Sequence, residues 1–257
     1  MKKRCLLLFF SCLFLLGGGC SPKKESVLAD DSIETGQGTL LPAEVIDLTN
    51  WKVTLPIDTD QDGRADEIKQ PQLATYRHAT YFDTSSTNDY VKFRAHCGGV
   101  TTPNSSYPRT ELREMKNNGR DQASWSTTSG THTMTMRQRV LKLPTNRPHV
   151  ITAQIHDASA LIVAFRLEDT RLYVQRQGES KVLVDANYSL GTWYNLKIEA
   201  QDGRIKVWYN DDLVFDWEKS ASGCYFKAGC YTQSNTFYDA PNAYAEVCIK
   251  NLKVEHK

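Results

Sequence analysis

The sequence predicts an all-β fold, a two-sheet antiparallel β-sandwich or jelly roll that forms one domain. Short runs in which apolar and polar residues alternate fill the chain after residue 42, and turn-forming residues separate them. No long amphipathic helix can be placed among these runs, and they contain no repeat unit. Many short strands of this kind favour two packed antiparallel sheets.

The expected strands follow one another with short connections. In chain order they cover residues 51–55, 90–95, 109–115, 132–141, 150–156, 161–167, 171–175, 194–200, 205–209, 225–233 and 245–254. Asp202-Gly203 and Asn210-Asp211-Asp212 flank one of these runs, as the turns of β-hairpins would. A modest helix is expected around residues 70–76.

The first 19 residues have the features of a bacterial lipoprotein signal peptide. Three basic residues precede an apolar run, residues 5–16, which is shorter than the about 20 apolar residues of a membrane-spanning helix. Cys20 follows small residues and resembles the cysteine that becomes the lipidated N-terminus. Gly17 stands where that motif prefers Leu, so ordinary secretion is the alternative.

The rest of the chain divides into a polar stretch, residues 20–42, and residues 43–257. We expect the first to be a flexible tether and the second to be the single domain of an exported lipoprotein. This protein would act as a monomer at the periplasmic or cell-surface side and touch the membrane only through its lipid. Loss of three cations with the signal peptide lowers the formal net charge from +1 to −2, which argues against a nucleic acid partner.

Four cysteines remain after the signal peptide, and export makes disulfide bonds feasible. Cys224 and Cys230 lie six residues apart on one expected strand, roughly 20 Å by the rise of a strand. Bridged Cα atoms are only about 4.4–6.8 Å apart, so these two should not pair with each other. Bridges from Cys97 and Cys248 to that pair, and four buried free thiols, are both open at this stage.

Three expected strands, within residues 109–113, 152–156 and 225–233, present polar and chemically capable side chains on one face. Successive side chains of a strand point to opposite faces. The polar faces carry Arg109, Glu111 and Arg113 on the first strand, Thr152, Gln154 and His156 on the second, and Tyr225, Lys227, Tyr231 and Gln233 on the third. If the three strands are neighbours in one sheet, these groups converge on a groove.

These segments resemble the signature strands of the alginate lyases of polysaccharide lyase family 7, the alginate lyase 2 superfamily. The family motifs read R-[ST]-E-L-R, Q-[IV]-H and Y-x-K-A-G-x-Y-x-Q, and all three are present here in that order. Weaker likenesses run from residues 51–56 to residues 251–254, so the resemblance covers nearly the whole domain. The family fold is a concanavalin-like jelly roll with a concave substrate cleft, in agreement with the alternation.

The resemblance implies a lyase that breaks a 4-linked polyuronate by β-elimination and needs no cofactor. The guanidinium of Arg109 and the amide of Gln154 are suited to neutralise the uronate carboxylate. By its resemblance to the family, Tyr231 is expected to be the general acid, and His156 the base when the sugar is guluronate. When the sugar is mannuronate, Tyr231 would be both base and acid. Ile155 is the variant that the family associates with guluronate-containing blocks.

Other residues are expected to bind alginate or to orient the catalytic groups. The expected substrate-binding residues are Arg113, Lys227, Gln233, Tyr225 and Tyr107. Glu111 should orient Arg109 or Arg113 through a charge-assisted hydrogen bond.

An acidic turn imitates the start of a calcium-binding loop. Asp58, Asp60 and Asp62 have the spacing of the first ligands, but the twelfth position is Lys69 where a bidentate Glu is needed. A solvated turn is therefore favoured over a weak structural calcium site.

Other function classes compete with the alginate lyase. One is a non-catalytic glycan-binding lipoprotein on the same scaffold, which the presence of a base and an acid disfavours. Another is a lyase of a different polyuronate, such as glucuronan. A retaining glycoside hydrolase would need two carboxylates about 5 Å apart, and alternating acidic pairs on a cleft strand are not evident.

Overall fold

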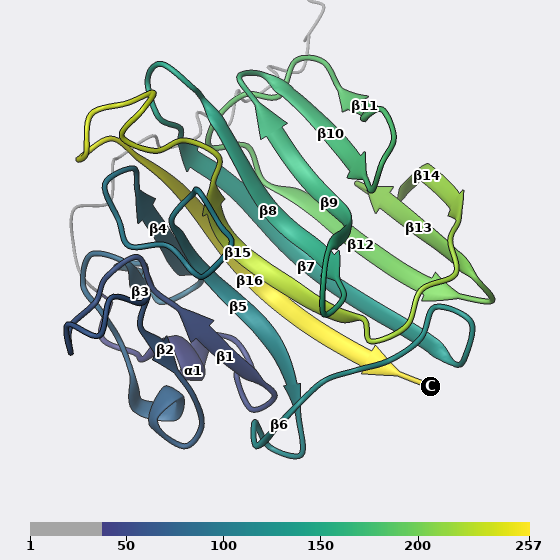
Figure 1. The fold of residues 1–257 in the computed structure, drawn as a ribbon, viewed down its shortest axis with the longest axis horizontal. Helices are drawn as coiled ribbons and strands as arrows, with labels where there is room; N and C mark the ends of the chain where they lie inside the picture. The colour runs from purple at the N-terminus through teal and green to yellow at the C-terminus, as the bar shows by residue number, and fades with distance from the viewer. Residues whose placement is uncertain (1–37) are drawn as a thin grey trace, which may run out of the picture. The chain divides into compact units, whose positions relative to one another are not determined.

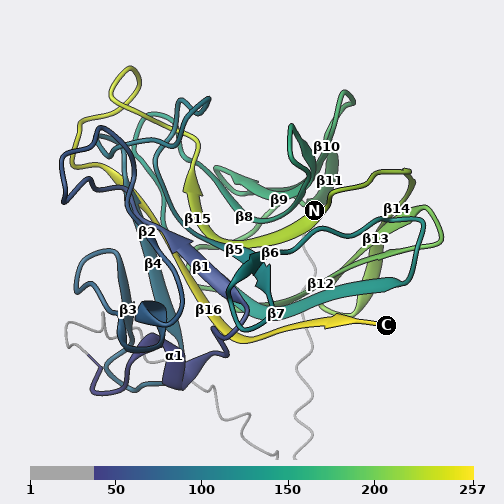
Figure 2. The same ribbon diagram turned by 60° about the horizontal axis from the view of Figure 1, so that its bottom comes forward.

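The computed structural model describes residues 38–257, which form two antiparallel sheets packed face to face. Figure 1 looks down on the larger sheet, and Figure 2 shows it above the smaller one, curved away from it. The expected signal peptide, Cys20 and most of the expected tether lie outside the described residues. In the described part, no helix has the length and hydropathy needed to cross a membrane.

The two sheets contain nine and seven strands. The larger sheet has the order β11 (Val182–Asp185), β10 (Arg171–Arg176), β9 (Leu161–Glu168), β8 (His149–His156), β15 (Tyr225–Thr232), β5 (Arg109–Lys116), β1 (Trp51–Thr54) and β2 (Glu67–Ile68), with β6 (Asp121–Gln122) paired to β5. The smaller sheet has the order β14 (Asp212–Glu218), β13 (Arg204–Tyr209), β12 (Tyr194–Gln201), β7 (Thr131–Lys142), β16 (Tyr244–His256), β4 (Val91–His96) and β3 (Phe82–Thr84). The helices are α1 (Pro42–Val45) and a 3₁₀ turn (Gln72–Thr75).

The predicted fold class is confirmed, and each of the eleven predicted strands is present with ends shifted by at most a few residues. The short strands β2, β3, β6, β11 and β14 were not predicted, because runs of two to seven residues at a sheet edge carry little alternation. The predicted helix around residues 70–76 is a single 3₁₀ turn, since the backbone at Tyr76 is already extended.

The core lies between the two sheets and is filled by inward-pointing aromatic and aliphatic side chains. Phe93, Phe165 and Phe226 are at most 1% exposed, and burial of each contributes about 1.5–3 kcal/mol. The four cysteines of the domain are also buried and free, which selects the second of the two alternatives left open by the sequence. Packing of the two sheets therefore holds this domain together without a disulfide bond among the described residues.

The expected hairpin turns are confirmed by their backbone angles. Asp202 and Gly203 both have positive φ, 51° and 72°, and so do Asn210 and Asp211, 50° and 71°. Two successive residues with positive φ match the type I′ turn, whose twist suits a two-residue hairpin loop. These turns join β12 to β13 and β13 to β14.

The buried carboxylate of Glu114, at the end of β5, connects the two sheets. It accepts hydrogen bonds from the backbone N of Phe226 on β15 at 2.8 Å and from Trp125 Nε1 at 3.0 Å. Its other oxygen lies 2.6 Å from Nε2 of His256 on β16, in the smaller sheet. One acidic side chain thus fixes β5 and β15 relative to each other and to the opposite sheet.

A β-bulge interrupts β15 at Gly229. Between Ala228 and Tyr231 the strand advances three residues while β8 advances two, from Ala153 to Ile151. Gly229 has a φ of 142°, and a Cβ atom there would lie 2.6 Å from the carbonyl oxygen of Thr110. Only glycine fits this backbone without strain.

We expect Gly229→Ala to lower the free energy of unfolding by about 3 kcal/mol, because it adds a steric clash to an unfavourable φ. Gly178→Ala is the matched control, since Gly178 also has a positive φ but a Cβ atom added there would have no neighbour within 4 Å. The control should lose only about 1 kcal/mol. Urea unfolding measures both changes, and equal losses would show that the close approach at Gly229 is unimportant.

Candidate active site

The three strands with polar faces are neighbours in the larger sheet, in the order β8, β15, β5. Lys227 in the middle strand pairs with Arg113 of β5 and with Gln154 of β8, while Tyr225 pairs with His156. This adjacency confirms the assumption on which the sequence-based site rests. Side chains from three strands therefore converge on one face.

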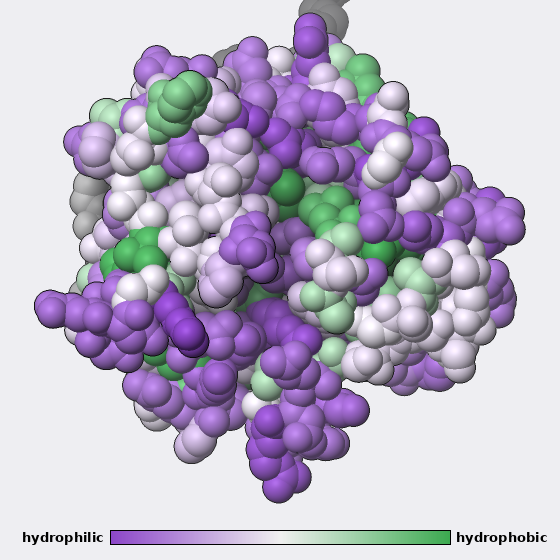
Figure 3. All heavy atoms as spheres, in the orientation of Figure 1, coloured by the Kyte–Doolittle hydropathy of each residue, from purple (hydrophilic) through white to green (hydrophobic). Residues whose placement is uncertain are grey.

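The concave face of this sheet is the candidate site. Figure 3 shows it as largely hydrophilic and hollowed near its centre. Next to β1, a cavity of about 390 Å³ is lined in part by Arg109, Arg113, Tyr225 and Lys227. Four of the residues predicted from sequence thus share one opening.

The carboxylate of Glu111 lies at the centre of this face and is 1% exposed. One oxygen accepts from Arg109 Nη1 at 3.1 Å and from Lys227 Nζ at 2.5 Å. The other accepts a hydrogen bond from the amide of Gln154. Glu111 thus orients Arg109, as predicted, but not Arg113, which donates to Gln122 and to the backbone oxygen of Glu114.

The charges in this cluster perturb one another. Burial by itself disfavours the ionised carboxylate of Glu111, but Lys227 and Arg109 outweigh it and hold the pKa of Glu111 below its usual value. Burial lowers the pKa of Lys227 to about 8, although Glu111 opposes this change. The floor of the cleft therefore carries one buried anion between two cations.

Tyr231 lies beside Arg109 on this face. The guanidinium of Arg109 stacks 3.7 Å from the centroid of the Tyr231 ring. The Tyr231 hydroxyl lies 3.1 Å from Oγ of Ser105, which also accepts from Arg109 Nη2 at 2.9 Å. Since Ser105 gives its own hydrogen to the carbonyl oxygen of Tyr107, the Tyr231 hydroxyl is the donor toward Ser105.

His156 presents its ring nitrogen Nε2 without a partner among the described residues. Its Nδ1 lies 2.5 Å from the carbonyl oxygen of Asp157, and because a carbonyl can only accept, Nδ1 carries the hydrogen. The neutral ring therefore has its lone pair on Nε2. Burial lowers the pKa of His156 below its usual range, which favours this neutral form. A stacked neighbour, Tyr225, and the guanidinium of Arg113 4.0 Å from the Tyr225 ring complete this end of the site.

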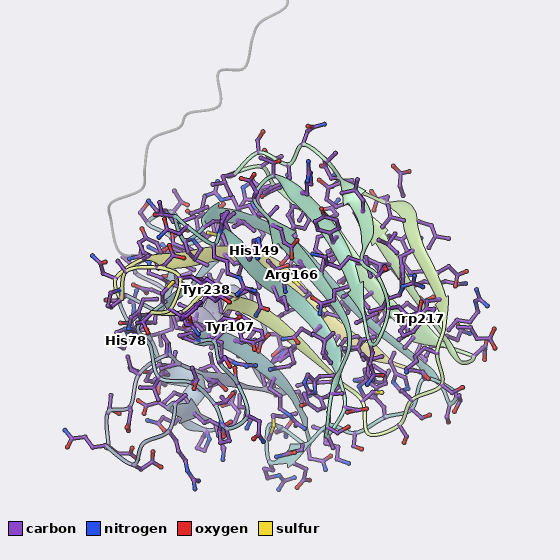
Figure 4. The ribbon with its side chains drawn as sticks, turned by 45° about the horizontal axis from the view of Figure 1, so that its top comes forward. His78, Tyr107, His149, Arg166, Trp217 and Tyr238 are labelled. Carbon is purple, nitrogen blue, oxygen red and sulfur yellow. The ribbon has the colours of Figure 1, made fainter. Side chains whose placement is uncertain are left out.

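The other end of the face holds a second polar group that the sequence interpretation missed. Arg166 of β9 donates to Gln233 Oε1 at 2.9 Å and lies 3.3 Å from His149 Nδ1. Figure 4 shows His149 and Arg166 together, with Tyr107 and Tyr238 nearby and with His78 farther away. The signal for Arg166 was a lone cation within the apolar run of β9. Gln233, predicted to bind substrate, accepts the hydrogen bond from Arg166 and holds this side chain in place.

Two further residues near the site had weaker signals in the sequence. Ser105 lies in the loop before β5, where alternation predicts nothing. Lys52 on β1 is 8% exposed and pairs with Glu67 at 2.5 Å, so it adds a cation to the wall of the cavity. Tyr107, predicted as a subsite, accepts a hydrogen bond from Arg147 Nη1 at 2.8 Å.

One predicted orientation is wrong. Thr152 was placed on the polar face with Gln154, but its hydroxyl accepts a hydrogen bond from Gln138 of β7, in the opposite sheet. The reason is a bulge in β8. The pairing advances two residues on β8, from Ile151 to Ala153, but only one residue on β9. Thr152 therefore points into the core.

The acidic turn differs from the predicted calcium ligands. Carboxylates of Asp58, Asp60 and Asp66 come within 4.8 Å of one another, whereas Asp62 binds the backbone N of Arg64. Asp58 accepts from two backbone N–H groups of its own loop, and Asp66 from Thr59. These hydrogen bonds hold the carboxylates of Asp58 and Asp66 in the turn.

Comparisons with known proteins agree with the geometry. A family model described as Alginate lyase matches residues 46–256. Alginate lyase AlgAT5 from polysaccharide lyase family 7 is 52% identical, with a TM-score of 0.82 over 85% of this chain and 100% of that one. The alginate lyase from Corynebacterium sp. is 44% identical, with a TM-score of 0.81 over 84% and 98% of the two chains.

A third solved structure carries a ligand. It is the family 7 alginate lyase A1-II′ in complex with a product written GGG, at 30% identity and a TM-score of 0.74 over 84% of this chain and 99% of that one.

We expect Glu111→Gln to lower the free energy of unfolding at pH 7 by about 3 kcal/mol, because two buried cations lose their anion. The pKa of Glu111 is lowered on folding, so its contribution is complete above pH 4.5 and is lost as the pH falls through the lowered value. The difference between the two proteins should therefore shrink in acid.

Urea unfolding from pH 7 down to pH 3 checks this expectation. Glu199→Gln is the matched control, since it breaks the more exposed pair with Lys197 and should cost about 0.5 kcal/mol or less. An equal loss in both variants, or a gap that widens in acid, would contradict the role given to Glu111.

Proposed function

The chain belongs to the alginate lyase family and is a polysaccharide lyase, and we propose that it cuts alginate by β-elimination on the face formed by β5, β15 and β8. The observation that carries this proposal is the cluster of Arg109, Lys227 and Gln154 around Glu111, next to Tyr231 and His156. It offers fixed donors for a uronate carboxylate beside an acid and a base.

The first requirement of the reaction is to make the C5 proton acidic. The neighbouring carboxylate opposes the charge that develops when this proton leaves, so the site must neutralise it with preorganised donors. Arg109 Nη1 donates one hydrogen to Glu111, and Nη2 donates one to Ser105. Each of these nitrogens has a second hydrogen that can bind a ligand. Gln154 likewise keeps one amide hydrogen.

Proton removal is assigned to His156 when the sugar is guluronate. Its Nε2 has the lone pair, since Nδ1 is bonded to the backbone. The C5 proton moves to Nε2, and the electron pair of the C5–H bond becomes the C4–C5 double bond. The C4–O bond breaks, and its electrons leave with the glycosidic oxygen.

Tyr231 is assigned as the acid that protonates this oxygen. Its hydroxyl hydrogen is directed at Ser105 in the free protein, and the Arg109 stack fixes the ring. Atoms and electrons therefore balance without water, and the two products are an unsaturated uronate and a new chain end.

We also propose a preference for guluronate-containing blocks, which rests on Ile155. This side chain is fully buried, so it lines the core and not the cleft. Its influence would be indirect, through the positions of Gln154 and His156 on either side. Arg113, Lys227 and Tyr225 would bind neighbouring uronates.

We expect Tyr231→Phe to lower kcat about 100-fold or more, because the leaving oxygen loses its proton donor. Ultraviolet absorbance of the unsaturated product measures the rate on polyguluronate, polymannuronate and glucuronan separately. Tyr173→Phe is a control, since Tyr173 lies on β10, outside the three site strands.

The native protein should act fastest on polyguluronate. A rise in ultraviolet absorbance with glucuronan alone would favour a lyase of another polyuronate. No product from any polymer, with binding retained, would favour a non-catalytic glycan-binding protein and end the lyase proposal.

A second expectation concerns pH. The base must be neutral, and burial lowers the pKa of His156 below 6.5. Activity should therefore persist below pH 6.5 and be lost only as the pH falls through the lowered value. The acid limb of kcat/KM on polyguluronate, which reports the free enzyme, measures this pKa. A limb centred above pH 6.5, or one unchanged in His156→Asn, would exclude His156 as the base.

A further inference from the structure

The outer face of the smaller sheet carries a cluster of cations on the side of the domain opposite the cleft. Inward-pointing Phe93, Met134 and Val247 mark the core side of β4, β7 and β16, so residues that alternate with them point outward. We call the following set the basic face: Lys92 and Arg94 on β4, Arg137 and Arg139 on β7, Tyr244 and Lys250 on β16, and, by contact with these, Lys142 and Trp193.

The cations of this face are only partly neutralised. Arg94 pairs with Glu246 at 2.6 Å and Lys250 with Asp89 at 3.4 Å. Within residues 38–257, no ion pair is formed by Lys92, Arg137, Arg139 or Lys142. The face therefore has a net positive charge in a chain whose overall charge is close to zero.

Two other outward cations of the same sheet are neutralised. Lys197 of β12 pairs with Glu199 at 2.9 Å, and Arg204 of β13 pairs with Asp216 at 2.9 Å. By contrast, Arg137 and Lys250 are direct cross-strand partners of like charge, an arrangement that destabilises a sheet. An anion bound beside this pair would lower the repulsion.

Aromatic rings hold these cations flat against the sheet. Lys250 Nζ lies 4.5 Å and the Arg139 guanidinium 4.7 Å from the centroid of the Trp193 ring. Arg94 and Lys142 lie 4.2 Å and 5.6 Å from the Tyr244 ring. Side chains placed in this way lose less conformational entropy when a ligand binds.

We propose that the basic face is a second, non-catalytic binding surface for the anionic polysaccharide. The cations lie on three adjacent strands, about 4.8 Å apart from strand to strand and about 7 Å apart along a strand. A polyuronate has one carboxylate on each sugar, so a chain lying across this face meets several cations at once. The identity of the polymer as alginate rests on the proposed function.

The two surfaces face opposite ways, as the positions of the sheets in Figure 2 show. One segment of polymer cannot occupy both, but a long polymer, or two polymers, can. Binding at the basic face would keep the enzyme on the polymer after a cut and raise the local concentration of substrate at the cleft.

The test uses the full chain carrying Tyr231→Phe, so that polymer is bound but not cut. High-molecular-mass alginate is the probe, and an excess of a short oligouronate, a trisaccharide, fills the cleft. Polymer binding that persists in this excess is expected. Arg137→Glu should weaken that residual binding about tenfold, because it removes one cation and pairs with Lys250.

Arg120→Glu is the matched control, since Arg120 is also an exposed arginine without an ion pair in the described part of the chain but lies between β5 and β6. It makes the same change in net charge and should leave the residual binding unchanged. Equal effects of the two variants would overturn the proposal, and so would complete competition by the trisaccharide. Thermal unfolding checks that Arg137→Glu remains folded.

A membrane surface is the competing partner. Vesicles of phosphatidylglycerol and phosphatidylcholine, with and without Arg137→Glu, test it. Binding to vesicles in place of residual polymer binding would overturn the polysaccharide assignment. Cleavage of a short oligouronate by Arg137→Glu with Tyr231 intact should match the parent protein, which separates failure of this inference from failure of the lyase proposal.

Discussion

The buried carboxylate of Glu111 is the interaction on which the cleft depends. Two cations contact it, Arg109 from the same strand, β5, and Lys227 from β15, while Gln154 approaches it from β8. Desolvated cations at this spacing would repel one another strongly without an anion between them. The carboxylate therefore makes it feasible to keep a dense positive charge on the floor of the cleft, ready for a uronate.

The supporting sheet fixes this cluster from behind. Glu114 joins β5 and β15 through the backbone of Phe226 and ties both to His256 in the opposite sheet. The bulge at Gly229 then sets Tyr231 one residue out of step with β8. Because the positions of Tyr231 and of the cations follow from strand register, rigid backbone hydrogen bonds determine the geometry of the site.

Alternation was sufficient to predict the fold class, the main strands and the shared face of Arg109, Lys227, Gln154 and Tyr231, since period-two patterns report burial directly. It failed at Thr152, because a bulge adds one residue and no local residue type announces it. It could not find Ser105, which acts from a loop. Nor did it find Arg166, whose importance lies in contacts with His149 and Gln233, which lie outside its own strand.

Both faces of the central site strand, β15, are in use, one in the core and the other in the cleft. On β15, Phe226, Ala228 and Cys230 fill the core while Tyr225, Lys227 and Tyr231 face the cleft, so any change meets either packing or chemistry. Divergence toward a different polymer is then easiest in the loops that rim the cleft, such as the loop of Ser105 and Tyr107 and the loop of Phe237 and Tyr238. The floor of the cleft and the loops around it can thus evolve at different rates within one domain.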